Sequence, residues 1–212
     1  VATRYSVDIV AIGDDMTRQM ADAVSSIKGV TDTVYAPAAS VTMRDANSGK
    51  TATALLIGVR DTEQIQRVMR VDIGKVAVDP DVGPVVDAVG LQPYGLAPER
   101  RGNVELGADD VLMPLYNAQT GRKLAFADGK ADFDTAWNRD GDMKRSLTLH
   151  ATQRDYRRIS TDYSAIGFVN ESHFSNGDLD TTTRALLMKA DTSASGASVD
   201  GLYTQMLSAL AK

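Results

Sequence analysis

The sequence predicts an α+β fold, and three features of the chain support this prediction. Residues 3–29 near one end and residues 184–212 at the other each read as a strand joined to an amphipathic helix. Between them, residues 61–142 hold five of the six prolines, and prolines and glycines divide this region into short pieces. We therefore expect residues 1–60 and 143–212 to form one α/β subdomain, with residues 61–142 inserted as a smaller mixed α/β subdomain.

The first unit opens with a strand over residues 3–12, where polar and apolar residues alternate. Asp14 or Asp15 is expected to cap the following helix, because a carboxylate accepts hydrogen bonds from the unpaired N–H groups there. Gly29 is expected to end this helix with a left-handed backbone conformation. The helix presents one apolar stripe, formed by Met16, Met20, Val24 and Ile27.

A second strand is expected over residues 30–35, interrupted at Pro37, and a β-hairpin follows. Its strands are residues 40–44 and 51–60, and the polar residues 45–50 are typical of a turn. Ser-Gly-Lys-Thr at this turn resembles the end of a phosphate-binding P-loop. However, the position four residues before this serine is an arginine instead of the required glycine, and a strand follows instead of a helix. The prediction is therefore a hairpin turn.

Short elements are expected in the rest of the chain. Asp61 is expected to cap a helix with the apolar residues Ile65, Val68 and Met69. The acidic residues 128–142 are expected to form a solvated loop. A final helix capped by Ser198 carries an apolar stripe of Val199, Leu202, Met206 and Leu210. The remaining strands are expected at residues 111–116, 123–127, 143–152, 163–169 and 186–189.

Composition excludes several classes of function. The 212 residues contain no cysteine, which excludes thiol catalysis, cysteine-ligated zinc and disulfides. A net charge of −5 argues against a general nucleic-acid surface, which needs a basic stripe. No segment approaches the roughly 18 consecutive apolar residues of a membrane span. Because the chain begins with valine, we expect it to be a piece of a longer polypeptide.

No sequence motif places a catalytic or metal site. The two histidines, His150 and His173, show no paired metal-ligand spacing, so we expect them to be surface or strand residues. No G-x-S-x-G elbow places a nucleophilic serine, although a triad assembled in space would leave no such motif. An EF-hand loop needs a closing glutamate, which the acidic segment lacks. We therefore expect no enzyme, no cofactor and no metal, and a solvated loop at Asp132, Asp134, Asp140 and Asp142.

Two clusters are candidate partner contacts. The acidic segment carries two aromatic residues, which can either anchor a partner or pin the loop to its own core. A later run has three arginines around a tyrosine, and we interpret it as a solvated β-ribbon or a contact surface because the whole chain is acidic. The candidate contacts are Phe133, Trp137, Arg154, Tyr156, Arg157 and Arg158.

Three segments, in this order and spacing, carry a family resemblance. Residues 27–34 (IKGVTDTV) follow the opening strand and helix, and residues 54–59 (ALLIGV) form an apolar strand with Asp61 after it. Residues 185–190 (ALLMKA) lead through a Ser/Gly/Ala spacer into the Leu-rich helix. Together they resemble the large extracytoplasmic domain of FtsX-like, MacB-type ABC transporter permeases.

The resemblance implies a porter-like α/β subdomain near the membrane, built from both chain ends, with the smaller subdomain inserted. In that family the domain lies between two transmembrane helices on the extracytoplasmic face of the bacterial cell membrane. The implied role is non-catalytic: the domain relays ATP-driven conformational change and contacts a peptide, lipid or envelope-protein substrate. The implied partners are a cytoplasmic ATPase subunit and a second permease copy, with no nucleic acid. Both chain ends should then lie at one pole.

Two other functions stay open from the residues alone. One is a secreted or surface-attached module whose middle section forms a ligand cleft. The other is a hydrolase with a spatially assembled site, in which His150 or His173 would face a serine and a carboxylate.

Overall fold

A computed structural model describes residues 9–45, 51–60, 62–68, 106–114, 132–139, 142–154, 163–191 and 199–211 of the chain. The helices and strands are, in order, β1 (Ile9–Gly13), α1 (Arg18–Ser25), β2 (Val30–Asp45), β3 (Thr51–Val59), α2 (Thr62–Val68), β4 (Asp110–Pro114), β5 (Asp132–Arg139), β6 (Asp142–Arg154), β7 (Ala165–Asn170), α4 (Ser172–Ser175), β8 (Thr183–Ala190) and α6 (Val199–Leu210). The fold class is α+β, as the sequence predicts.

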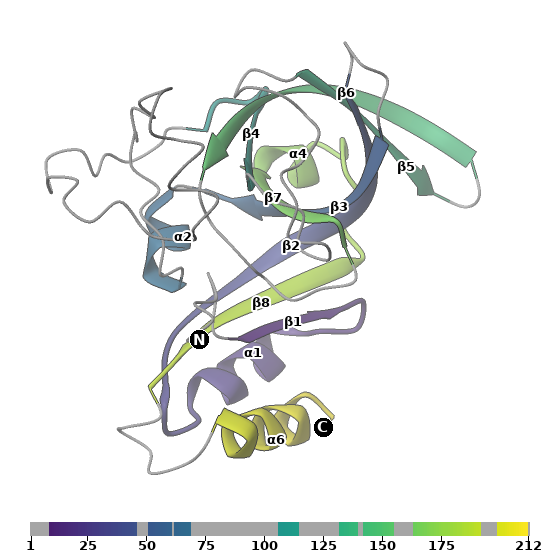
Figure 1. Ribbon diagram of the computed structural model, residues 1–212. Coiled ribbons are helices and arrows are strands. Elements are labelled where there is room, and N and C mark those ends of the chain that lie inside the picture. Colours follow the sequence, from purple (N-terminus) through teal and green to yellow (C-terminus); the bar gives the residue numbers. More distant parts are fainter. Residues whose placement is uncertain are drawn as a thin grey trace, which may run out of the picture.

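One eight-stranded sheet connects every strand, in the order β1-β8-β2-β3-β7-β4-β6-β5. β5 also pairs with β2, so the six strands from β2 to β5 in this order close into a ring. Figure 1 looks along this ring, which we call the barrel. The pairs β3–β7 and β4–β6 are parallel, and the other pairs are antiparallel.

β2 belongs to two parts of the molecule at once. Its first half, up to Ala38, pairs with β8, and its second half, from Ala38, pairs with β3 in the barrel. The predicted interruption at Pro37 is therefore wrong, because the strand runs through it. Pro37 lies where pairing with β3 has not yet begun, so its missing N–H can face a side without a neighbouring strand.

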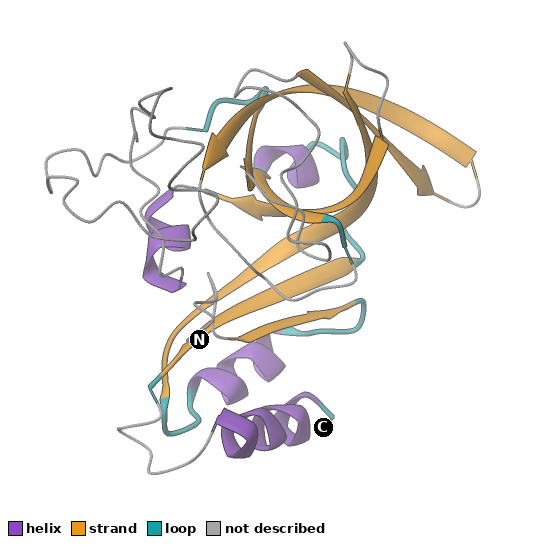
Figure 2. Cartoon of the chain, in the orientation of Figure 1, coloured by secondary structure: helices purple, strands orange, loops and turns teal. Residues whose placement is uncertain are grey.

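The strands β1, β8 and the first half of β2 form a small layer with α1 and α6 on one face (Figure 2). Leu186 and Met188 of β8 point to these helices, and Met206 of α6 packs in the same cluster. Ile9 and Leu210, close to the two described ends of the chain, also belong to it. The described ends therefore lie at one pole of the molecule. We call the layer at this pole, with its strands β1, β8 and the first half of β2 and its helices α1 and α6, the two-helix layer.

A second apolar cluster fills the barrel. Alternate residues of β2, β3, β4 and β7 belong to it, including Val41, Leu56 and Val111, and Phe174 of α4 packs among them. A third cluster covers the opposite face of the same strands under α2, and there Phe168 is fully buried beside Leu187. This third cluster continues from the barrel onto β8, so one core joins the barrel to the two-helix layer.

Most predicted elements are confirmed. The hairpin pairs Arg44 with Thr51, α2 buries Ile65 and Val68, and α6 buries Leu202 and Met206. Strands form where alternation or apolar runs predict them, at β4, β6, β7 and β8. The predicted strand at residues 123–127, most of the hairpin turn, Asp61, Met69 and Ser198 lie outside the described residues.

Three further local predictions are wrong. The acidic segment is not a loop over its whole length, because Asp132–Arg139 forms β5. Thr17 caps α1 in place of an aspartate, accepting a hydrogen bond from the Met20 N–H at 3.2 Å. Asp14 instead accepts a hydrogen bond from the Thr183 hydroxyl at 2.7 Å, which ties β8 to the loop after β1. Gly29 has a φ of 104°, but it follows the helix cap at Ser26 by three residues.

The division into subdomains stays a prediction. β4 and β5 lie within residues 61–142, and both pair with strands outside that range. In the described ranges, no helix is both long and apolar enough to cross a membrane.

Candidate functional site

The six predicted contact residues do not gather in one described place. Phe133 and Trp137 lie four positions apart on β5. Arg154 is the last residue of β6. Tyr156, Arg157 and Arg158 lie outside the described residues. Their role as partner contacts stays a prediction.

The structure places three of the four aspartates expected in a solvated loop on strands. Asp132 and Asp134 lie on β5, Asp142 begins β6, and Asp140 is outside the described ranges. Within the described part of the chain, no three histidine, aspartate or glutamate side chains gather as metal ligands would.

His173 is buried on the short helix α4, which corrects its prediction as a surface or strand residue. Its Nδ1 lies 3.2 Å from Oδ2 of Asp178, and its Nε2 donates to the backbone carbonyl of Ala108. The ring thus joins α4 to the segment before β4. A catalytic triad needs a serine hydroxyl at the nitrogen opposite the carboxylate, and a carbonyl occupies that place here. The described contacts of His173 are therefore structural. His150, by contrast, lies on β6.

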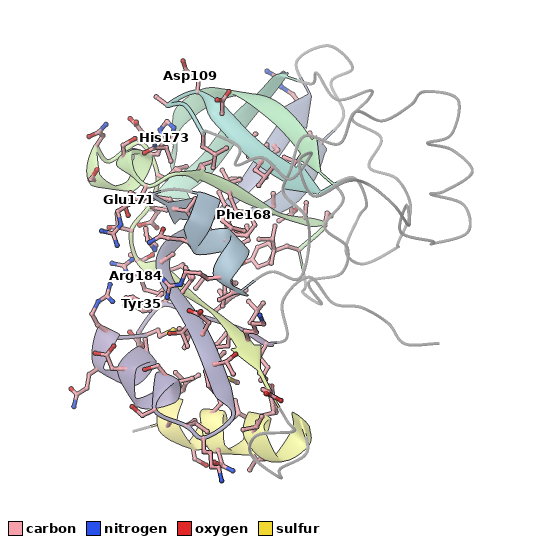
Figure 3. The ribbon with its side chains drawn as sticks, turned by 90° about the vertical axis from the view of Figure 1, so that its left-hand side faces the viewer. Tyr35, Asp109, Phe168, Glu171, His173 and Arg184 are labelled. Atoms are coloured by element: carbon pink, nitrogen blue, oxygen red, sulfur yellow. The ribbon has the colours of Figure 1, made fainter. Side chains whose placement is uncertain are left out.

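A cavity of about 520 Å³ lies between the two-helix layer and the barrel. Figure 3 shows Tyr35, Arg184 and Glu171 along this side of the molecule, below the α4 residue His173. The layer and the barrel both contribute to its wall, which consists of Arg18, Tyr35, Ala36, Pro37, Gly58, Arg60, Gln64, Glu171, Phe174, Ser175, Thr181 and Arg184. We call this the junction pocket. Its volume falls in the range of small-molecule sites, about 300–1,000 Å³.

Arginine side chains from three separate elements meet at the junction pocket. Arg18 comes from α1, Arg60 follows β3, and Arg184 lies on β8. Among the described lining residues there is one carboxylate, that of Glu171. The lining is therefore positively charged, in a chain whose net charge is −5.

Local contacts hold two of these guanidinium groups in place. Arg18 lies 4.9 Å from the centre of the Tyr35 ring, a cation–π contact, and the Tyr35 hydroxyl donates to the Met16 carbonyl at 2.7 Å. Nη1 of Arg184 donates to the carbonyls of Thr181 and Thr183. Both arrangements use one face or one nitrogen of the guanidinium, so within the described part of the chain other N–H groups of the fork are available to a ligand.

The third arginine is held more loosely. Nε of Arg60 lies 3.7 Å from Glu171, and the two side chains are 70% and 44% exposed. Such an exposed pair contributes little to stability and can exchange partners.

Apolar residues form part of the pocket wall. A methyl group at Gly58 would lie 2.7 Å from the Phe174 ring and 3.0 Å from Cγ of Pro37, so only glycine lets these groups approach. Phe174 reaches this wall from the barrel interior. The junction pocket therefore combines a positive rim with a tight apolar side.

Sequence reasoning did not find this pocket. Its three arginines stand far apart in the chain, at the start of α1, directly after β3 and on β8. Only the pairing of β8 with β2 and of β2 with β3 brings them together. No local spacing rule predicts such a meeting.

No protein-family model and no curated protein sequence matches the chain. Among solved structures, the extracellular domain of a noncanonic ABC-type transporter, YknZ, from Gram-positive bacteria is similar at 12% identity and a TM-score of 0.36, covering 91% of this chain and 79% of that one. The periplasmic region of MacB from Actinobacillus actinomycetemcomitans gives 12% identity and a TM-score of 0.33, covering 91% and 73%. At these TM-scores neither likeness fixes the fold or the function of this protein.

Proposed function

We propose that this chain is the extracytoplasmic domain of an ABC transporter permease and has no catalytic activity of its own. The observation that carries the proposal is the shared cluster of the two-helix layer, which holds Ile9 from β1 and Leu210 from α6. A domain inserted between two transmembrane helices needs both of its ends at the membrane-facing pole. The order of the three sequence segments that resemble FtsX-like permeases points to the same setting.

In this proposal β2 transmits movement. Its 16 residues pair with β8 in the two-helix layer and with β3 and β5 in the barrel. A continuous hydrogen-bonded strand resists bending between the two parts, so a shift of the layer would carry the barrel with it as a rigid body. ATP hydrolysis by a cytoplasmic subunit would thereby move a surface outside the membrane.

α6 offers a surface toward the rest of the permease. Tyr203 and Leu207, one helical turn apart, are each 48% exposed, whereas their sequence neighbours Leu202 and Met206 are buried. We place this exposed pair against the membrane-embedded part or a second permease copy. The barrel, at the other end in Figure 1, would contact substrate or an envelope partner, with Phe133 and Trp137 on β5 as candidates.

Labelling of single cysteines in intact cells tests whether this domain lies outside the cell membrane. These 212 residues contain no native cysteine that would also react with the label. Thr53 of β3 and Gln205 of α6 are exposed, so Thr53→Cys and Gln205→Cys in the full-length protein, with any other cysteines replaced, serve as probes. We expect a membrane-impermeant maleimide to modify both without lysis. The buried variant Leu56→Cys should stay unmodified in the folded protein. Modification of the two exposed sites only after lysis would contradict the proposal.

A further inference from the structure

We propose that the junction pocket binds a small organic oxyanion, a carboxylate or phosphate group joined to an apolar body. The inference goes beyond the permease function and does not depend on it, since it rests on the side chains that line the pocket. Three arginines against one glutamate select a negative ligand. The guanidinium fork matches the oxygens of carboxylate and phosphate, to which it can donate two parallel hydrogen bonds.

The described contacts leave the arginine charges available to a ligand, because no described carboxylate forms a close hydrogen bond with them. Among the described residues, Arg18 stacks on Tyr35 and Arg184 donates to backbone carbonyls, so neither faces a carboxylate there. Arg60 has Glu171 at 3.7 Å, longer than a hydrogen bond. An oxyanion that reached these groups would replace weak or neutral contacts with charge-assisted hydrogen bonds.

The apolar residues of the pocket favour a ligand that carries an apolar group next to its charged end. Pro37, Gly58 and Phe174 leave a close-packed surface beside the arginines. A phenyl-sized group could bury apolar area against it while its charged end stays at the rim. A bare inorganic ion would use the arginines alone and bind more weakly.

The pocket also spans two parts of the molecule. Arg18 and Arg184 belong to the two-helix layer, whereas Arg60 and Glu171 follow barrel strands. A bound oxyanion would connect the layer to the barrel, and it would raise the unfolding temperature because it binds only the folded chain.

Calorimetric titration and thermal unfolding of the purified chain with four probes test the proposal. The probes are phenylacetate, phenyl phosphate, inorganic phosphate and the neutral phenylacetamide. We expect phenylacetate or phenyl phosphate to bind and to raise the unfolding temperature, and the stronger of the two identifies the head group. Phenylacetamide should give no shift. Equal shifts from phenylacetamide and phenylacetate, binding of inorganic phosphate as tight as phenyl phosphate, or no binding of any probe would each overturn the proposal.

Arginine variants localise the binding. Arg18→Gln and Arg184→Gln should each weaken binding about tenfold or more, the loss of a hydrogen bond to a charged group. Arg18 is exposed on α1, so its variant tests the site even if Arg184→Gln fails to fold. The matched control is Arg67→Gln on α2, since Arg67 pairs with Asp32 at 2.7 Å and does not line the pocket. Equal weakening by Arg67→Gln and Arg18→Gln would show non-specific attraction and contradict the site.

Discussion

Phe168→Ala should lower the free energy of unfolding by about 3–5 kcal/mol, one of the largest effects of any single substitution in this chain. Phe168 is fully buried on β7 and packs in the cluster that lies under α2 and continues onto β8. Removing the ring takes away its apolar burial and leaves a cavity that close-packed strands cannot fill. Urea unfolding followed by circular dichroism measures the change.

The control for this prediction is Ile166→Val, two residues earlier on the same strand face and 2% exposed. It removes one methylene group and should cost about 0.5–1.5 kcal/mol. A loss for Phe168→Ala no larger than that of Ile166→Val would mean that the outer face of β7 is not a packed core.

Leu186→Ala should lower the free energy of unfolding by about 2–5 kcal/mol. Leu186 lies on β8 between β1 and β2, is fully buried, and packs in the cluster of α1 and α6 with Val24 and Met206. Leu207→Ala on α6 is the matched control, because the same chemical change occurs at a side chain that is 48% exposed. A surface change of this kind should stay within about 0.5 kcal/mol.

Leu186→Ala also tests whether the two-helix layer and the barrel unfold together. Trp137, the only tryptophan, lies on β5 in the barrel, whereas α1 and α6 lie in the layer. Because β2 and one apolar cluster join the two parts, we expect Leu186→Ala to move the Trp137 fluorescence transition and the helical circular dichroism transition by equal amounts. A fluorescence midpoint that stays in place while the dichroism midpoint falls would show two independent units.

The sequence predicts best the strands that are buried on both faces. The run ALLIGV in β3 alternates between the outer cluster, with Leu55 and Ile57, and the barrel interior, with Leu56. The run ALLM in β8 behaves in the same way between α2 and the two helices. A strand covered on both sides needs apolar residues throughout, so composition alone identifies it.

Elsewhere the local signal is weaker than the tertiary context. The sequence of β5 has the even spacing of a strand between Phe133 and Trp137, but its acidic residues suggest a loop when composition is given priority. Pro37 suggests an interruption, yet the strand passes through it at the point where its neighbours change. The barrel itself depends on the pairing of β2 with β5, two strands distant in sequence, and no local pattern encodes that closure.

The junction pocket shows the same limit for function. Arg18, Arg60 and Arg184 each read as ordinary surface charges, because an arginine beside a strand or on a helix is usually solvated. They line one pocket only because the pairing of β8 with β2 and of β2 with β3 brings them together.

In the proposed function, ATP-driven movement reaches the barrel through the two-helix layer. Spin labels on Thr53→Cys in the full-length permease, assembled with its ATPase subunit in membranes, measure the distance between the barrels of two permease copies by electron–electron double resonance. We expect this distance distribution to shift between the nucleotide-free state and the state with a non-hydrolysable ATP analogue, while the distance between labels at positions 53 and 205 of one copy stays constant. Identical distributions between the copies in both nucleotide states would contradict the account.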